Sequence, residues 1–347
     1  MNFKPRWLAT GIGSLPVLDP EEAVSLVLEY LPEIPIWPQL PQRGPVEGMV
    51  WQYSEGMPRI RADVKSNKIW IDATGDLTPD LETFYEHFLT GNTEYFALSR
   101  EFAPGYYAML NRLKSALPKG VAALKGHITG PITFGMGMKD QQGGYVIYNP
   151  DLFDSVLKTL RMKAVWQIEG LSQFSLPVII FMDEPAMTSY GSAYFNVSKE
   201  QVIEYWNEVI DGIKEKNGIS GIHCCGNMDW SLPFESRIDI VNFDAYGYIE
   251  KLGMYHEELK RFLERGGILA WGIVPTDRGG RMEVEFLVNR LEVAITDLVA
   301  KGIDKKILFD QSMVTPSCGM GSLTEEEALE ILKTTKEVSR IMRSKSC

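Results

Sequence analysis

Residues 176–227 read LPVIIFMDEPAMTSYGSAYFNVSKEQVIEYWNEVIDGIKEKNGISGIHCCGN. Two short apolar runs, at 176–182 and 221–225, flank a segment at 199–214 in which apolar residues recur at helical spacing. A strand, a helix and a second strand in this order form a unit whose strands run parallel and whose crossover is right-handed. The stretch therefore predicts a parallel sheet, and both of its strands end in polar residues.

The same alternation continues along the chain in both directions. Apolar runs typical of strands lie at residues 8–13, 34–40, 121–128, 176–182, 221–225, 238–243, 268–274 and 306–310. Helical spacing is found at residues 21–30, 152–173, 199–214, 283–298 and 325–342. Eight such units in 347 residues predict an α/β protein with a (β/α)8 TIM barrel, organised as one domain over residues 1–347. No glycine-rich phosphate-binding motif supports an open nucleotide-binding sheet instead.

One connection is far too long for an ordinary link between a strand and a helix. It covers residues 41–119 and follows the second predicted strand. We expect an insertion within the barrel domain, made of a hairpin at 59–73 that turns at 65–68, followed by helices over 80–98 and 104–117.

The composition excludes several classes of function. The chain has 35 Lys and Arg against 46 Asp and Glu, a formal charge of -11, which repels nucleic acid and anionic lipid. No apolar run is long enough for a membrane span or resembles a signal peptide, so we expect a cytoplasmic protein without nucleic-acid or membrane partners. The four cysteines, at 224, 225, 318 and 347, are too few for a disulfide framework and are expected to be reduced thiols.

Soft metal ligands gather at predicted strand ends, which face the functional site in a TIM barrel. His223 and Cys225 lie two residues apart, so their side chains share one face of a strand and Cys224 points away. Cys318 would reach the same point from the loop after the last strand. His and Cys are preferred zinc donors, and three protein ligands with one open position are typical of a catalytic site. The alternative is that these residues are packed in the barrel core.

Other titratable residues stand at neighbouring strand ends. Asp183 and Glu184 follow an apolar run, and this carboxylate pair could hold an amine, act as acid and base, or form salt bridges. His127 could be a catalytic acid or base, a stacking residue or a core histidine.

Four short motifs, in this order along the chain, resemble the catalytic half of cobalamin-independent methionine synthase. GIGSLP at 11–16 is similar to the I-G-S-F-P segment of that family, and DEPA at 183–186 to its I-D-E-P-A segment. His223-x-Cys225 is similar to its H-x-C zinc pair, and TPSCG at 315–319 to its N-P-D-C-G cysteine segment. The superfamily also holds uroporphyrinogen decarboxylase and the corrinoid-dependent thiol methyltransferases.

The resemblance implies a zinc-dependent transfer of a methyl group to the thiol of homocysteine, which gives methionine. It implies that His223, Cys225 and Cys318 bind Zn²⁺, with Asp244 at the position of a further glutamate ligand. It also implies that Ser14 holds the substrate carboxylate and that Asp183, supported by Glu184, holds the ammonium. His127 is the strand-end histidine left over as a catalytic acid.

The expected methyl donor is a methylated corrinoid, carried by a separate corrinoid protein. HCCGN at 223–227 resembles the H-x-C-G-N of corrinoid-dependent coenzyme M methyltransferases, and the chain lacks the second barrel of the folate-using enzymes. Two alternatives stay open: a methyltransferase acting on another thiol such as coenzyme M, and a zinc-binding barrel without catalysis. A metallohydrolase is disfavoured, because two thiolates make zinc a poorer Lewis acid for water.

Overall fold

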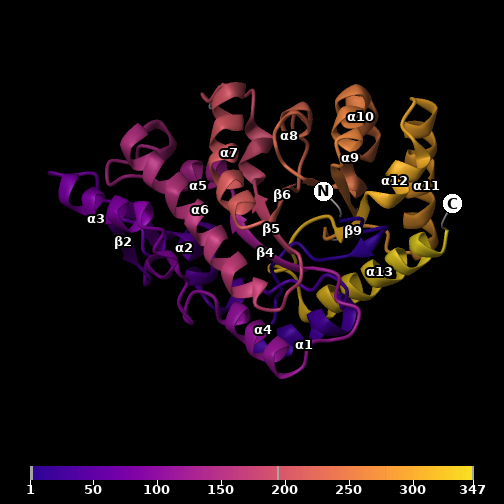
Figure 1. Cartoon of the computed structure of the whole chain (residues 1–347), viewed down its shortest axis with the longest axis horizontal. Coiled ribbons are helices and arrows are strands. Elements are labelled where there is room, and N and C mark those ends of the chain that lie inside the picture. The colour runs from indigo at the N-terminus through magenta and orange to yellow at the C-terminus, as the bar shows by residue number, and fades with distance from the viewer. Residues whose placement is uncertain (1–2, 194, 278, 346–347) are drawn as a thin grey trace.

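The computed structural model describes residues 3–193, 195–277 and 279–345. Its main sheet has seven parallel strands in the order β1-β9-β8-β7-β6-β5-β4, and it curls so that helices cover its outer side (Figure 1). The strands are β1 (Leu8–Ala9), β4 (Leu124–Thr129), β5 (Val178–Asp183), β6 (Ile219–Cys224), β7 (Ile240–Phe243), β8 (Ile268–Val274) and β9 (Ser312–Pro316). This arrangement is a TIM-like barrel.

The eighth position of the barrel is taken by residues 34–40, where the sequence predicts a regular strand. Ile36 bridges Lys125 of β4, and Gln39 bridges Ser14, which follows β1, so this segment joins the two edges of the sheet. It forms isolated bridges instead of a ladder. The physical reason is its prolines, at positions 35, 38 and 41, which have no backbone N–H to donate.

The prediction of a last strand at residues 306–310 is wrong. These residues form the short helix α12 (Lys305–Asp310), and β9 follows it directly. The side chain of Asp304 accepts a hydrogen bond from the Ile307 backbone N–H (2.9 Å), which starts a helical turn at the apolar run.

The five helices predicted from apolar spacing are confirmed as α1, α6, α7, α11 and α13. Ser198 with Gln201 forms a capping box at the start of α7, and Thr324 with Glu327 forms one at the start of α13. The helices are α1 (Pro20–Tyr30), α2 (Met49–Ser54), α3 (Thr78–Leu89), α4 (Pro104–Ser115), α5 (Pro131–Gly137), α6 (Pro150–Ser172), α7 (Lys199–Glu215), α8 (Ser231–Glu235), α9 (Ala245–Leu252), α10 (His256–Glu264), α11 (Val284–Ala300), α12 and α13 (Glu325–Ser344). None of these helices is long and apolar enough to cross a membrane.

The barrel interior is apolar at its lower end. A separate hydrophobic cluster gathers inward-facing residues from successive strands: Ile34, Ala123, Ile179, Phe181, Ile219, Ile240, Ile268, Ala270 and Met313. Side chains alternate along a strand, so the next inward positions after Phe181 and Ile219 include Asp183 and His223. The polar site therefore lies at the carboxyl ends of the strands, above a packed apolar layer.

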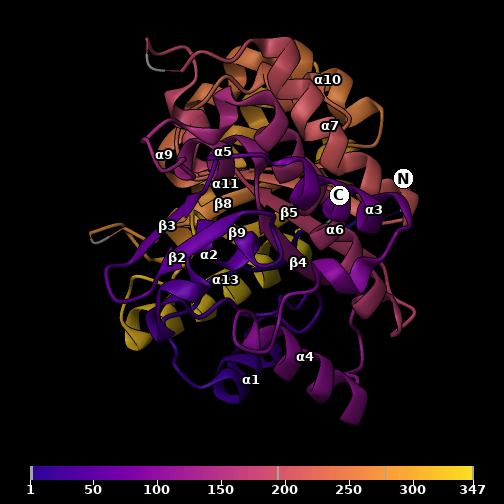
Figure 2. The same ribbon diagram turned by 90° about the vertical axis from the view of Figure 1, so that its left-hand side faces the viewer.

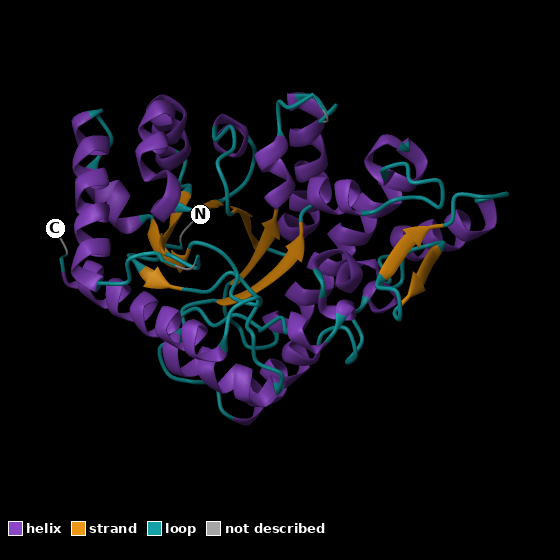
Figure 3. Ribbon diagram, turned by 180° about the vertical axis from the view of Figure 1, so that it is seen from behind, coloured by secondary structure: helices purple, strands orange, loops and turns teal. Residues whose placement is uncertain are grey.

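The long connection contains the predicted hairpin. Strands β2 (Ile60–Asp63) and β3 (Lys68–Ile71) pair antiparallel; in Figure 2 they lie on the side nearest the viewer, and Figure 3 shows them apart from the barrel strands. The hairpin is tied to the loop after α5, because the Ile71 backbone N–H donates to the Lys139 carbonyl (2.9 Å). Further along the connection, α4 packs against α1 of the barrel layer.

Candidate metal centre and adjoining pocket

Three soft ligands converge at the strand ends as the sequence predicts. His223 lies on β6, Cys225 directly follows that strand, and Cys318 follows β9. One ligand atom from each lies within 4.8 Å of the others. The Nε2 atom of His223 is buried and has no hydrogen-bond partner among the described residues. An unpaired imidazole nitrogen beside two sulfurs fits a metal ion of the zinc type.

Asn242 on β7 orients the His223 ring. Its Nδ2 atom donates to the Ala270 carbonyl and to Thr315 Oγ1, both at 2.8 Å. Its Oδ1 atom is thereby left to accept from His223 Nδ1. This fixes the tautomer of the imidazole and leaves Nε2 as the free lone pair on the metal side. The sequence analysis did not identify Asn242, although a polar residue inside the apolar run 240–243 was a usable signal.

The two thiols are electrostatically linked. A hydrogen bond from Cys318, with the His223 imidazole nearby, lowers the pKa of Cys225 to about 4. The same contact raises the pKa of the Cys318 thiol. This contact favours the thiolate of Cys225, and a thiolate is the form that binds metals. Cys224 points away, with its thiol toward the Gly226 carbonyl (3.6 Å), and Cys347 lies outside the described residues.

Asp183 presents an unpaired carboxylate oxygen next to this group. It ends β5 and is paired in register with His223 of β6. Its Oδ1 atom is buried without a hydrogen-bond partner among the described residues. Burial raises the pKa of Asp183 to about 6, against the opposing charges of His223 and Lys125. A buried carboxylate of this kind is suited to a cationic partner.

A cavity of about 320 Å³ joins these residues. Its walls are the strand ends, the segment at 39–49 and the loop at 318–322, with Ser14, Asp183, His223, Cys225 and Cys318 exposed to it. No Lys or Arg is among the described residues that line it, whereas Asp183 and Glu47 are. The cavity therefore favours ligands with a positive group.

Ser14 anchors the loop that carries Cys318. Its Oγ atom accepts from the Gly321 backbone N–H (3.1 Å), and its carbonyl accepts from the Met320 N–H (3.0 Å). A Cβ atom on Gly319 would lie 2.3 Å from Ser14 Oγ, so this close approach requires glycine. The hydroxyl hydrogen of Ser14 remains available to a ligand in the cavity.

Glu47 is a wall residue that the sequence analysis missed. It is fully buried, its Oε2 atom accepts from the Leu40 N–H (2.8 Å), and its Oε1 atom pairs with Arg43 Nε (2.9 Å). Burial raises the pKa of Glu47 to about 7 despite these contacts. No periodic pattern around residue 47 indicated this position.

Asp244 is not brought into the ligand group. Its Oδ1 atom accepts from the Gly247 N–H (2.8 Å), so the side chain caps α9. It is absent from the set of ligand atoms that lie within 4.8 Å of one another. The expectation of a fourth protein ligand is not supported by this geometry.

Glu184 faces away from the cavity. Its carboxylate accepts from the backbone N–H groups of Ile132 (3.0 Å) and Thr133 (2.7 Å), from Thr133 Oγ1 (2.7 Å) and from Trp206 Nε1 (2.9 Å). These four donors occupy both oxygens, and three of them, including two backbone N–H groups, belong to Ile132 and Thr133 in the first turn of α5. Glu184 thus holds α5 beside the strand ends. It is not among the described residues that line the cavity, and its contacts are with α5 and Trp206, whereas the resemblance implied that it supports Asp183 in holding a substrate ammonium.

His127 lies in the packed interior and is not among the residues that line the cavity. Its ring stacks on Trp37 with 4.0 Å between centroids, and neither ring nitrogen has a partner among the described residues. Burial and the nearby Lys125 hold the pKa of His127 well below its usual range. The alternative of a packed histidine fits this geometry better than a catalytic acid.

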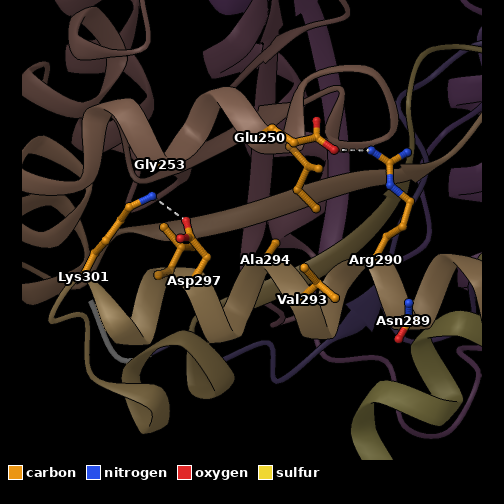
Figure 4. A pocket seen from close by; sticks show the side chains of 10 residues that line it. Glu250, Gly253, Asn289, Arg290, Val293, Ala294, Asp297 and Lys301 are labelled. Atoms are coloured by element: carbon orange, nitrogen blue, oxygen red, sulfur yellow. Dashed lines mark hydrogen bonds and ion pairs between the residues drawn. The ribbon is translucent and has the colours of Figure 1, made fainter.

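A second cavity, of about 470 Å³, lies between α9 and α11 on the outside of the barrel (Figure 4). Ion pairs Glu250–Arg290 and Asp297–Lys301 lie at its walls. Its charged groups are thus already paired, and none of its lining residues belongs to a strand end.

Comparison with known proteins bears on the fold. No protein-family model and no curated protein matches the chain. A solved B12-independent methionine synthase from Shewanella sp. W3-18-1, in complex with selenomethionine, is 14% identical, with a TM-score of 0.56 over 99% of this chain and 95% of that chain. A D-psicose 3-epimerase in the presence of D-fructose is 12% identical over 74% of this chain and 86% of that one, but its TM-score of 0.37 carries no argument. The chain therefore has a TIM-barrel-like fold similar to that of a methionine synthase.

Proposed function

We propose that this protein is a zinc-dependent methyltransferase that methylates the thiol of homocysteine to give methionine. The observation that carries the proposal is the His-Cys-Cys group with the unpaired Asp183 carboxylate in the same small cavity. The group supplies a place for a sulfur atom, and Asp183 supplies a place for an ammonium. The methionine synthase-like fold is consistent with this combination.

The donor set fits zinc, with His223, Cys225 and Cys318 as its ligands. When bound, the ion would supply a Lewis acid that favours the thiolate form of a thiol substrate near neutral pH. In the transfer, the substrate sulfur would donate an electron pair to the methyl carbon, and the donor's bond to that carbon would break with its electrons staying on the leaving group.

Residues of the chain would bind and orient the rest of the substrate. Asp183 accepts hydrogen bonds from the ammonium, which compensates its buried charge. The Ser14 hydroxyl donates to the carboxylate, and the Gly321 contact holds that hydroxyl in place. A cavity of about 320 Å³ accommodates a small amino acid but is small for a whole cofactor such as a corrinoid, so the methyl group must arrive through the cavity mouth.

Coenzyme M fits this cavity less well than homocysteine. Homocysteine brings an ammonium that can pair with Asp183 as well as a carboxylate, whereas coenzyme M brings a sulfonate and no amine. Among the described residues that line the cavity there is no Lys or Arg, so Asp183 would face the sulfonate without a compensating cation, which disfavours coenzyme M. A zinc-binding barrel without catalysis is distinguished by failing to bind any small thiol.

The methyl donor is a separate question. The structural neighbour is described as B12-independent, which gives no support to the corrinoid expected from the sequence. The test is a methyl-transfer assay of zinc-loaded protein with homocysteine and either methylcobalamin, a methylated corrinoid protein or methyltetrahydrofolate. Methionine formation with any donor supports the proposal, and the donor that reacts decides whether a corrinoid is used. Methylation of coenzyme M but not of homocysteine would reject the proposal that homocysteine is the substrate.

A further inference from the structure

One buried charged group has no part in the functions described so far. Lys125 lies on β4 with 1% of its surface exposed, and its side chain points into the barrel. Its ammonium donates to the Ile12 carbonyl (2.5 Å) and lies 4.1 Å from the centre of the Phe181 ring. Among the described residues it forms no ion pair with a carboxylate. Burying an ammonium this way is costly, so its position calls for a reason.

The position of Lys125 is directly beneath the candidate site. Phe181, over which the ammonium lies, is two residues before Asp183 on the same inward face of β5. Ile12, which accepts its hydrogen bond, lines the cavity and is two residues before Ser14. The positive charge of Lys125 acts on Asp183, although burial lowers the pKa of the lysine to about 7.

The charges of a filled site explain why a cation is useful there. The two charges of a zinc ion are matched by the thiolates of Cys225 and Cys318. Asp183, the substrate sulfur and the substrate carboxylate add three negative charges, and the substrate ammonium adds one positive charge. Two negative charges are then left over in a buried region, where they are poorly solvated.

We propose that Lys125 is a positioning residue whose ammonium offsets part of this negative charge and thereby favours the thiolate form of the bound substrate. The inference rests on the proposed function of the site. It predicts that Lys125 matters more for ligands with an anionic sulfur than for ligands with a neutral one. A residue that only supported the fold would affect both equally.

The test compares a thiol with its thioether on zinc-loaded protein. Homocysteine and methionine share the ammonium and the carboxylate, but only homocysteine can bind as a thiolate. In Lys125→Met we expect homocysteine affinity, measured by calorimetry, to fall on the order of tenfold more than methionine affinity, as for two unit charges about 10 Å apart at an effective dielectric constant of about 20. Lys125→Gln keeps a donor for the Ile12 carbonyl without the charge, and it should behave as Lys125→Met does.

Lys163 provides a matched control. It is also a fully buried lysine, its ammonium donates to the Phe96 carbonyl (3.1 Å), and burial lowers its pKa to about 7 as well. It lies on α6 and does not line the cavity. Lys163→Met should leave the ratio of homocysteine to methionine affinity within about twofold of the wild type. Equal losses for both ligands in the two neutral Lys125 variants, or a change of the same size in Lys163→Met, would overturn the proposal.

A second ligand pair separates this inference from the substrate proposed above. Cysteamine and its S-methyl ether carry an ammonium but no carboxylate. If the wild type prefers cysteamine over its ether and the Lys125 variants lose that preference, the inference holds even where homocysteine fails to bind. If the variants keep the wild-type preference in both pairs, or the wild type shows none, Lys125 does not act through the sulfur.

Discussion

Replacing Asn242 by leucine should weaken zinc binding without removing any ligand. The substitution keeps the side-chain size but abolishes the acceptor for His223 Nδ1 and the donors to the Ala270 carbonyl and Thr315 Oγ1. At about 1 kcal/mol for each of three hydrogen bonds, the free energy of unfolding of metal-free protein should fall by about 3 kcal/mol. Loss of the partner that orients a metal-binding histidine typically lowers metal affinity by about 10- to 100-fold.

Two companion variants separate orientation of the ring from general loss of stability. Asn242→Asp keeps the acceptor for His223, so its zinc affinity should stay within about threefold of the wild type even though the contacts to Ala270 and Thr315 are disturbed. Thr315→Val removes one of the three hydrogen bonds and should cost about 1 kcal/mol of stability with little effect on zinc.

Zinc affinity is measured by competition for Zn²⁺ with a chromophoric chelator. The free energy of unfolding is measured in urea on metal-free protein, because bound metal would add to the stability of the folded state. Equal zinc affinity in Asn242→Leu and the wild type would refute the assignment of Nε2 as the ligand atom. A loss in Asn242→Asp as large as in Asn242→Leu would show that packing, and not the acceptor, is what matters.

Three further predictions follow from the same site and its surroundings. The wild type should hold about one zinc per chain, Cys225→Ser and Cys318→Ser should each lose most of it, and Cys224→Ser should retain it. Metal analysis that finds full zinc content in Cys225→Ser and Cys318→Ser would contradict the ligand assignment. Asp183→Asn should weaken homocysteine binding by at least about tenfold while changing zinc content little, and unchanged affinity by calorimetry would argue for a thiol without an amine. Burial lowers the pKa of Lys163 to about 7, so between that pH and about 10 the unfolded chain binds a proton that the folded chain lacks. The free energy of unfolding should rise with pH across this window, and it should rise less in Lys163→Met.

The sequence sufficed for those features that depend on strand ends. His223, Cys225 and Cys318 could be grouped because parallel strands bring their carboxyl ends to one edge, whatever the distance along the chain. The position of the second predicted strand, at residues 34–40, could be predicted, but its pairing could not. Its prolines keep the segment extended but lack the backbone N–H groups that a regular ladder needs.

The sequence did not show where the side chains of residues just after a strand point. Asp244 and Glu184 stand next to strand ends, but nearby backbone N–H groups at the starts of α9 and α5 take their oxygens. Lys125 and Asn242 went unnoticed for the opposite reason. Each lies inside a strand, and its role depends on neighbours from other strands that alternation does not identify.

The contact between Ser14 and Gly321 spans 307 positions of the chain and joins the segment after the first strand to the loop after the last. On a ribosome, His223 and Cys225 emerge together, while Cys318 appears 93 residues later. Until then a nascent chain would offer two of the three proposed ligands and an unfinished cavity. On the proposed ligand set, zinc would load only after the segment that carries Cys318 has been made, and release of the metal would report separation of the segment after β1 from the loop after β9.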